Sequence, residues 1–263
     1  MIRLASTIML VRPALSENFE VFMLRRSAKS TFAPDVFVFP GGTVDKADYE
    51  DKLLARFTGL DQERLARMFR AIETPHLEAS GESTLSAADS RALIIAALRE
   101  LFEEAGVLLG ADTISSVDPI TLHQVRTKLL EGKQTFLQTL EELGVRLNAG
   151  ELEFFSQWIT PPSEGRRFNA HFFVARADAQ HAIADRNETH DEIWIAPRVA
   201  LERCAGGSYA MVYPTIKHVE RLAEFHSIDE LLQFAKEKPI LQIMPHTTAD
   251  QGFSLPRELE YAW

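Results

Sequence analysis

The sequence predicts an α/β protein with a mixed sheet, and three observations support this prediction. Short segments rich in β-branched and aromatic residues recur along the chain and end at proline or glycine. Segments with apolar residues at helical spacing lie between them. The 263 residues, 46% of them hydrophobic, are enough for a sizeable core. Since no repeat, low-complexity tract or convincing linker divides the chain, we predict a single domain over residues 1–263, an α/β sandwich.

Composition excludes several classes of function. The net charge of −10 and the pI near 5.3 argue against a nucleic-acid-binding surface. The single cysteine, Cys204, excludes an internal disulfide and a cysteine-based zinc site, and its expected role is that of a small buried apolar residue. No apolar run reaches the length of a membrane-spanning helix, and residues 1–11 are too short for a secretory signal. We therefore expect a soluble, cytoplasmic protein without nucleic-acid or membrane partners.

The first elements are predicted to be strands. Residues 4–11 and 19–24 are rich in aliphatic and β-branched residues and lie on either side of turn-forming residues, which favours a hairpin. The second strand ends at Arg25 and Arg26. These arginines either protect a sheet edge or bind phosphate, and the sequence leaves both interpretations open.

A third strand is predicted to stop at Pro40, where Gly41 and Gly42 follow. The pair favours a tight turn, and it would also let the main chain approach a metal or a phosphate closely. Residues 46–85 are predicted to form a mostly helical insertion. A helix then starts at a capping box, Ser86 to Asp89, and ends at Gly106.

The second half of the chain continues the same alternation. Residues 119–143 predict two helices divided near Gly132, and the fully apolar segment 171–175 predicts a central strand. The remaining predicted elements are strands at 152–160, 193–195 and 240–244 and helices at 198–203, 215–225 and 228–236.

Three glutamates share one face of the helix that ends at Gly106. Glu100, Glu103 and Glu104 stand at i, i+3 and i+4, so their carboxylates lie together. Like charges at this spacing destabilise a helix unless a cation compensates them, and a hard divalent cation would do so. A solvated acidic face is the alternative.

The residues around these glutamates resemble the signature of the Nudix hydrolases. Arg99 to Val107 matches the downstream half of that signature, Arg-Glu-apolar-any-Glu-Glu-any-Gly-apolar, at every specified position. The upstream half differs, because Gly42 lies 57 residues before Arg99 instead of the family's 14. The signature's first glutamate falls on Arg91 when counted back from Arg99 and on Asp48 when counted forward from Gly42.

An insertion at this place resembles the branch that includes peroxisomal coenzyme A diphosphatases and bacterial relatives. Segments 158–161, 166–168 and 172–173 and Trp194 also resemble that branch. The resemblance implies a Nudix-like α/β/α sandwich from about residue 4 to 225, leaving 226–263 as a C-terminal extension. A separate coenzyme A signature of the family is absent before Pro40, so this substrate is implied by the branch alone.

The resemblance implies hydrolysis of a nucleoside diphosphate linked to another group, with Mg²⁺ or Mn²⁺ as cofactor. Coenzyme A or acyl-coenzyme A is the expected substrate, with ADP-ribose or NADH as the alternative. A Nudix-like module that senses a nucleotide without cleaving it is the non-enzymatic alternative, although such modules usually lose a signature glutamate. Homodimers are frequent in the family.

The resemblance also assigns roles to residues. It implies Glu103 and Glu104 as the main metal ligands, Glu100 as a ligand or base, and Arg99 as their ion-pair partner. Further candidate metal ligands are the Gly42 carbonyl and Glu188, with Glu192 as the alternative to Glu188. The candidates for substrate binding are Arg26, Gly41, Arg166, Arg167 and Phe168. His171 and His190 are expected to be structural or surface residues.

Overall fold

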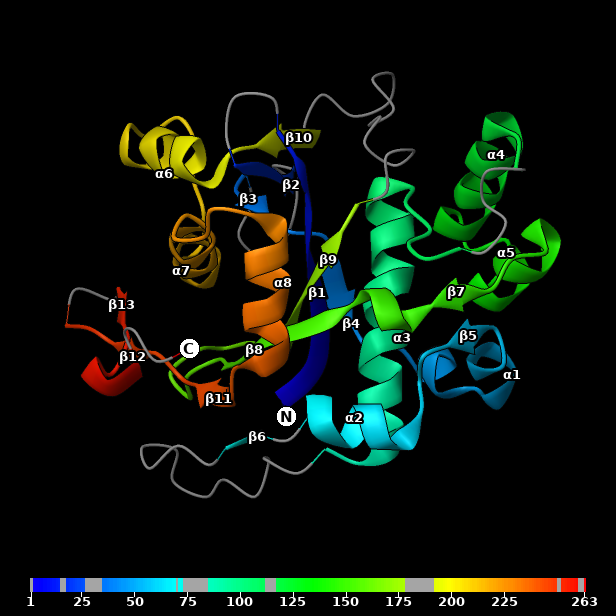
Figure 1. The fold of residues 1–263 in the computed structure, drawn as a ribbon, viewed down its shortest axis with the longest axis horizontal. Helices are drawn as coiled ribbons and strands as arrows, with labels where there is room; N and C mark the ends of the chain where they lie inside the picture. The colour runs from blue at the N-terminus through cyan, green and yellow to red at the C-terminus, as the bar shows by residue number, and fades with distance from the viewer. Residues whose placement is uncertain are drawn as a thin grey trace.

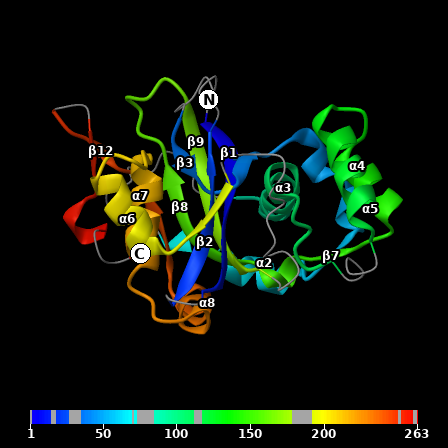
Figure 2. The same ribbon diagram turned by 90° about the horizontal axis from the view of Figure 1, so that it is seen from above.

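The computed structural model describes residues 2–14, 18–26, 35–69, 71–72, 85–111, 117–177, 192–249, 252–259 and 263. A nine-stranded sheet forms the middle layer, and helices cover both of its faces (Figures 1 and 2). The predicted α/β/α sandwich is therefore confirmed. In spatial order the strands are β10 (Glu192–Ile195), β2 (Phe19–Arg25), β1 (Ile2–Pro13), β9 (Arg167–Arg176), β8 (Glu153–Ile159), β11 (Ile240–Ile243) and β6 (Ala71–Ile72), with β3 (Phe37–Val38) on β2 and β4 (Gly41–Thr43) on β1.

The sheet is mixed, as the sequence predicts. β1 and β2 form the expected antiparallel hairpin, in which Val11 lies opposite Val21. β1 runs parallel to β9, and β9 runs antiparallel to β8. The apolar segment Phe172–Ala175 thus lies in a central strand, buried on both faces. The tail adds β11 between β8 and β6, parallel to both.

Gly41 and Gly42 do not form the turn that the sequence favours. They continue as β4, antiparallel to β1, with Gly41 opposite Thr7 and Gly42 opposite Ser6. Neither glycine has a positive φ. A Cβ on Gly41 would lie 2.3 Å from the Ser6 carbonyl oxygen, so glycine is needed here for close approach.

The glutamate-bearing helix, α3 (Ala87–Ala105), has the predicted ends. Ser86 and Asp89 form a capping box, and Gly106 closes the helix with φ +68°. The segment from Ala92 to Leu98 is buried all round, because α3 lies between the sheet and an outer layer. That layer contains α4 (Pro119–Leu130) and α5 (Phe136–Leu143), the two helices predicted around Gly132.

The insertion is only partly helical in its described residues, 46–69, 71–72 and 85. It contains the 3-10 helix η1 (Lys46–Tyr49), α1 (Asp51–Leu54) and α2 (Gln62–Met68), together with two short strands that the sequence did not predict. β5 (Phe57–Thr58) pairs with β7 (Leu147–Asn148), which leads into a 3-10 turn, η3 (Ala149–Glu151), and β6 joins the main sheet. The insertion is part of the core, since Leu53, Phe57 and Leu65 are buried.

The other face of the sheet is covered by α6 (Pro197–Ala205), α7 (Tyr213–Leu222) and α8 (Ile228–Glu237), close to their predicted positions. The tail adds β12 (His246–Thr247), β13 (Phe253–Ser254) and η4 (Arg257–Leu259). Trp263 is buried in the core cluster that these helices form with the sheet, which includes Phe155, Val219 and Leu231. Cys204 is half-buried against this cluster instead of fully buried.

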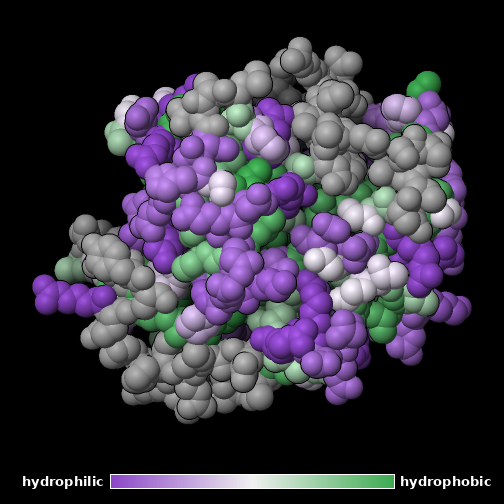
Figure 3. Space-filling view, viewed as in Figure 1, coloured by the Kyte–Doolittle hydropathy of each residue, from purple (hydrophilic) through white to green (hydrophobic). Residues whose placement is uncertain are grey.

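On the face seen in Figure 3, hydrophilic residues form most of the coloured surface, and hydrophobic residues show between them in separate areas. Within the described part of the chain, no helix combines the length and the apolar character needed to cross a bilayer.

Candidate active site

Arg99 is the centre of the polar cluster around the signature helix. Its guanidinium is almost fully buried and bonds three carboxylates and a carbonyl. Nη1 donates to Glu100 at 2.9 Å and to Glu103 at 3.1 Å, which gives the predicted i, i+4 ion pair. Nε and Nη2 donate to the two oxygens of Asp48 at 3.0 and 3.1 Å, and Nη2 also reaches the Thr43 carbonyl. Arg99 therefore fixes two glutamates of α3 relative to β4 and η1.

Asp48 takes the position of the signature's first glutamate, for which the sequence offered both Asp48 and Arg91. It is fully buried on η1 and meets Arg99 as a bidentate partner, the strongest geometry for this pair. Its own side chain also accepts the Asp45 N–H at 2.8 Å, which shapes η1. Arg91 instead lines a cavity beside η1. The forward count from Gly42, which ends on Asp48, is thus the one that the structure supports.

The two glycines of β4 lie directly against the glutamates. The Gly41 N–H donates to Glu104 at 2.8 Å. A Cβ on Gly42 would lie 2.3 Å from Glu100 Oε1. The strand can approach α3 this closely only because neither residue has a side chain.

Burial makes the charged forms of these carboxylates unfavourable. It raises the pKa of Glu100 to about 7, although the adjacent Arg99 opposes the rise. It raises the pKa of Glu104 to about 7 as well, against the Gly41 hydrogen bond and the charges of Arg26 and Arg126. Burial also raises the pKa of Glu103. Three carboxylates, those of Asp48, Glu100 and Glu103, surround the Arg99 guanidinium, and Glu104 lies outside this group on the Gly41 N–H.

The donor set fits a hard divalent cation. Glu100, Glu103 and Glu104 each use one oxygen in the hydrogen bonds above. Each of these carboxylates also has a second oxygen that takes part in none of these bonds. Carboxylate oxygens are the ligands that Mg²⁺ prefers, and a cation would offset the cost of burying three like charges. Within the described residues, no three such side chains already converge as a formed metal cluster.

Two arginines outside the signature lie near Glu104. Arg26, predicted for substrate, follows β2, and its charge lowers the pKa of Glu104. Arg126 was not predicted. From α4 it donates to the carbonyls of Glu103 at 3.1 Å and Glu104 at 2.8 Å. No spacing rule connects Arg126 with α3, so only the packing of the two helices reveals it.

The other predicted residues lie elsewhere or outside the described residues. Arg167 pairs with Ile2, five residues along β1 from the Thr7 that faces Gly41, which is roughly 16 Å at about 3.3 Å per residue. Arg166 is exposed, and Phe168 is half-buried beside Arg167. A substrate role for these three residues remains a prediction, and it would concern a distant part of a long ligand.

The predicted histidines and loop acids have mixed outcomes. His171 is fully buried in β9, in agreement with its predicted structural role. Glu188 and His190 lie outside the described residues. Glu192 begins β10 and pairs with Leu24, two residues before Arg26, which puts it at the same end of the sheet as Arg26.

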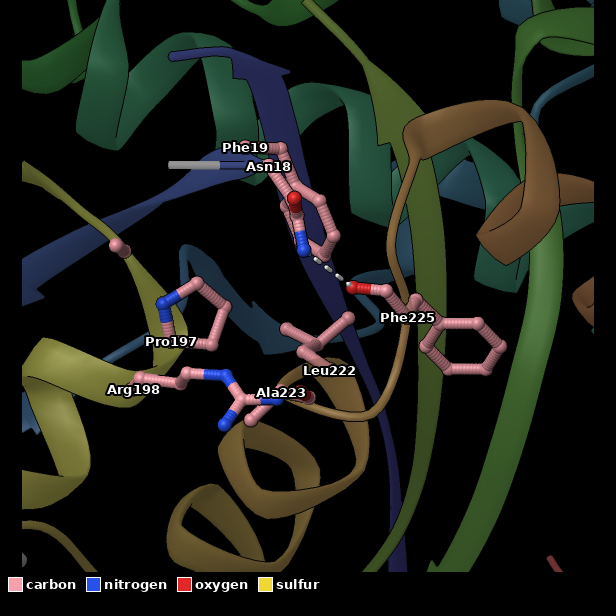
Figure 4. A pocket seen from close by; sticks show the side chains of 8 residues that line it. Asn18, Phe19, Pro197, Arg198, Leu222, Ala223 and Phe225 are labelled. Carbon is pink, nitrogen blue, oxygen red and sulfur yellow. Dashed lines mark hydrogen bonds between the residues drawn. The ribbon is translucent and has the colours of Figure 1, made fainter. Parts of the chain in front are cut away.

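Two small cavities are too small for a nucleotide. One lies on the opposite face and has a volume of about 10 Å³; Pro197, Arg198 and Leu222 line it, and the Asn18 amide donates to the Phe225 carbonyl beside it (Figure 4). The other, beside Asp48, has about 20 Å³. Such volumes hold about one water molecule.

Comparison with known proteins decides the family. A family model described as the NUDT19 Nudix domain matches residues 1–222, which end where α7 ends. The chain belongs to the Nudix hydrolase family. This Nudix hydrolase keeps all three glutamates of the signature helix, and its 46–85 insertion separates the two halves of the Nudix signature.

Two similar proteins are named acyl-coenzyme A diphosphatase NUDT19. The Xenopus laevis protein is 28% identical over 246 residues, which are 83% of this chain and 63% of that protein. The human protein is 29% identical over 247 residues, 85% of this chain and 65% of that protein. This Nudix hydrolase thus spans less than two thirds of their length.

A solved structure supports the fold. The NUDIX hydrolase from Alicyclobacillus acidocaldarius superimposes with a TM-score of 0.64 at 23% identity. The match covers 89% of this chain and 96% of that structure.

Proposed function

We propose that this Nudix hydrolase cleaves the diphosphate of coenzyme A and acyl-coenzyme A. The choice of substrate is supported by the similarity, over more than four fifths of the chain, to proteins named acyl-coenzyme A diphosphatases. The reaction class follows from the family and from the complete Arg99, Glu100, Glu103 and Glu104 set. Water adds to one phosphorus, and the bridging P–O bond breaks. The products are 4′-phosphopantetheine, still acylated if the substrate was, and adenosine 3′,5′-bisphosphate.

In the proposed mechanism, Glu103 and Glu104 hold Mg²⁺ or Mn²⁺, and the Gly42 carbonyl is a further candidate ligand. When bound, the cation neutralises the diphosphate charge and acidifies the attacking water. Arg99 keeps Glu100 and Glu103 in place through the two bonds of its Nη1. Glu100 is either a third ligand or the base that accepts the proton of water, and a pKa of about 7 suits a base at neutral pH.

The other proposed contacts are with substrate. Arg26 is close enough to Glu104 to change its pKa, so its guanidinium is well placed to bind a phosphate near the metal. Arg166, Arg167 and Phe168, roughly 16 Å along β1 at about 3.3 Å per residue, are candidates for a more distant part of the molecule. Glu188 remains a candidate loop ligand, with Glu192 as its alternative.

A substrate panel tests the proposal. Coenzyme A, a long-chain acyl-coenzyme A, ADP-ribose and NADH are incubated with the protein and Mg²⁺ or Mn²⁺, and products are separated by chromatography. We expect the two coenzyme A compounds to be cleaved fastest and EDTA to abolish the reaction. The activity of Glu103→Gln should be lower by about 100-fold or more, whereas the exposed Glu202→Gln on α6 should keep full activity.

Each result of the panel has a clear meaning. If ADP-ribose or NADH is cleaved faster, that compound and not coenzyme A is the substrate, and the proposed reaction class still holds. Tight nucleotide binding without any product would favour a sensing module. Full activity of Glu103→Gln would show that the metal site is assigned to the wrong residues.

A further inference from the structure

The end of α3 is an unfavourable place for two glutamates. The last carbonyls of a helix have no partner within the helix and carry partial negative charge. Glu103 and Glu104 lie in this last turn, and α3 has no basic residue there. Gly106 N–H bonds the Phe102 carbonyl at 2.9 Å. Two of the remaining carbonyls are those of Glu103 and Glu104 themselves.

Arg126 of α4 supplies the cation that α3 lacks. Its Nε donates to the Glu103 carbonyl at 3.1 Å, and its Nη2 donates to the Glu104 carbonyl at 2.8 Å. One planar guanidinium therefore holds the main chain of both residues in a fork, which a lysine could not reproduce. Its charge also lowers the pKa of the Glu104 carboxylate.

The surroundings of Arg126 fix it in this position. Its neighbour Val125 is fully buried in the core between α3 and α4. Gly106 leaves room for the guanidinium, since a Cβ there would lie 3.3 Å from Nη1. The left-handed φ of +68° favours glycine at the end of the helix, and a Cβ there would also displace the guanidinium by a few tenths of an ångström.

We propose that Arg126 is a positioning residue of the metal site, which holds the backbone of Glu103 and Glu104 so that their carboxylates can bind one divalent cation. The inference rests on the proposed function for the identity of the metal ligands. It adds a residue from a separate helix, outside the signature, that determines how well these ligands are organised.

A positioning role and a purely electrostatic role predict opposite results. If Arg126 acted only through its charge, its loss would remove a repulsion and tighten the binding of Mn²⁺. If it holds the two ligands in place, its loss weakens Mn²⁺ binding, because partners of metal ligands typically contribute 10- to 100-fold in affinity. A residue that merely capped α3 for stability would change the melting temperature and leave Mn²⁺ affinity unchanged.

The test measures Mn²⁺ binding to the full chain by electron paramagnetic resonance, without substrate. Arg126→Gln removes the charge and the fork, and Arg126→Lys keeps the charge and removes only the fork. We expect the dissociation constant for Mn²⁺ to rise about ten-fold or more in both variants. Circular dichroism verifies the fold of each variant. If Arg126→Gln does not fold, the Mn²⁺ affinity of Arg126→Lys is the test. The matched control is Lys128→Gln, which removes another α4 cation, one paired with Glu142.

Mn²⁺ binding equal to or tighter than wild type in a folded Arg126 variant would overturn the inference. With substrate, the Mn²⁺ concentration for half-maximal activity should rise in the same variants, while KM at saturating metal stays near wild type. The proposed function fails separately, if the wild-type protein binds Mn²⁺ and cleaves no coenzyme A compound.

Discussion

Arg99 and Asp48 form a buried, bidentate ion pair across 51 residues of sequence. The pair joins the signature helix to η1, the first turn of the insertion. It therefore restores, through space, a connection that the insertion removes from the linear signature. The remaining nitrogen of Arg99, Nη1, is left to hold Glu100 and Glu103.

Replacement of Asp48 by Asn should destabilise the protein and weaken catalysis. The change leaves the buried Arg99 without its bidentate counter-charge, and loss of one partner of a buried ion pair costs about 3 kcal/mol or more. Urea unfolding measures this loss. Activity should fall about ten-fold or more because Arg99 then orients the glutamates less well. Glu50→Gln, an exposed change beside η1, is the control. Wild-type stability of Asp48→Asn would show that the pair adds nothing to the fold.

Alanine at the two glycines of β4 should separate stability from activity. At Gly42 the new Cβ meets the Glu100 carboxylate, the end of a side chain that can move, so the fold should persist while metal-dependent activity falls about ten-fold or more. At Gly41 it meets the Ser6 carbonyl, which cannot move freely, so the melting temperature should fall. Thermal unfolding and initial rates measure both effects.

The control for the glycine variants is Gly165→Ala, where a Cβ has open space around it. This variant should resemble wild type in both assays. Equal activity of Gly42→Ala and wild type would show that Glu100 tolerates displacement, and its proposed role would then be wrong.

The sequence predicts what local chemistry determines. The ends of α3 follow from Ser86, Asp89 and Gly106, whose capping roles depend on a few neighbouring residues. The hairpin of β1 and β2 and the central position of β9 follow from apolar patterning. These elements lie where they were expected.

Features that depend on tertiary contacts cannot be predicted from the sequence. Gly41 and Gly42 suggest a turn, and only the approach of Ser6 and Glu100 reveals why glycine is needed. The two-residue strands β5 and β6 are too short to show a period. Arg126 lies at no fixed spacing from the glutamates it contacts.

Stability without metal should fall as pH rises from about 4.5 to about 7. The folded protein holds protons on Glu100 and Glu104 in this window, because burial raises the pKa of both to about 7, whereas the unfolded chain releases them near 4.5. Melting temperatures in EDTA should thus decline between about pH 4.5 and about pH 7. Mg²⁺ should restore stability most at the upper end, where protons compete least.

Glu104→Gln tests the cause of this pH dependence. Its amide cannot ionise, so the decline in EDTA should be smaller than in wild type, and Mg²⁺ should stabilise the variant less. If wild type and variant lose the same melting temperature over the same pH range, Glu104 does not contribute to the effect.

Lys238 should make the protein less stable at neutral pH than an apolar residue would. Its ammonium is enclosed, has no hydrogen-bond partner among the described residues, and lies 4.4 Å from the centre of the Phe155 ring. Burial, together with the charge of Arg221, lowers the pKa of Lys238 to about 7. The unfolded chain keeps the proton up to about 10.5, so this contribution to stability rises with pH from about 7 to about 10.5.

Near neutral pH, Lys238→Met should therefore have a free energy of unfolding about 1–3 kcal/mol higher than wild type, and a higher melting temperature. The advantage should shrink toward about pH 10, where the folded wild type has already lost the proton. Lys236→Met, an exposed change on α8, should stay within about 0.5 kcal/mol of wild type. A less stable Lys238→Met at neutral pH would mean that the Phe155, Phe234 and Trp263 rings hold the cation favourably enough to offset its burial.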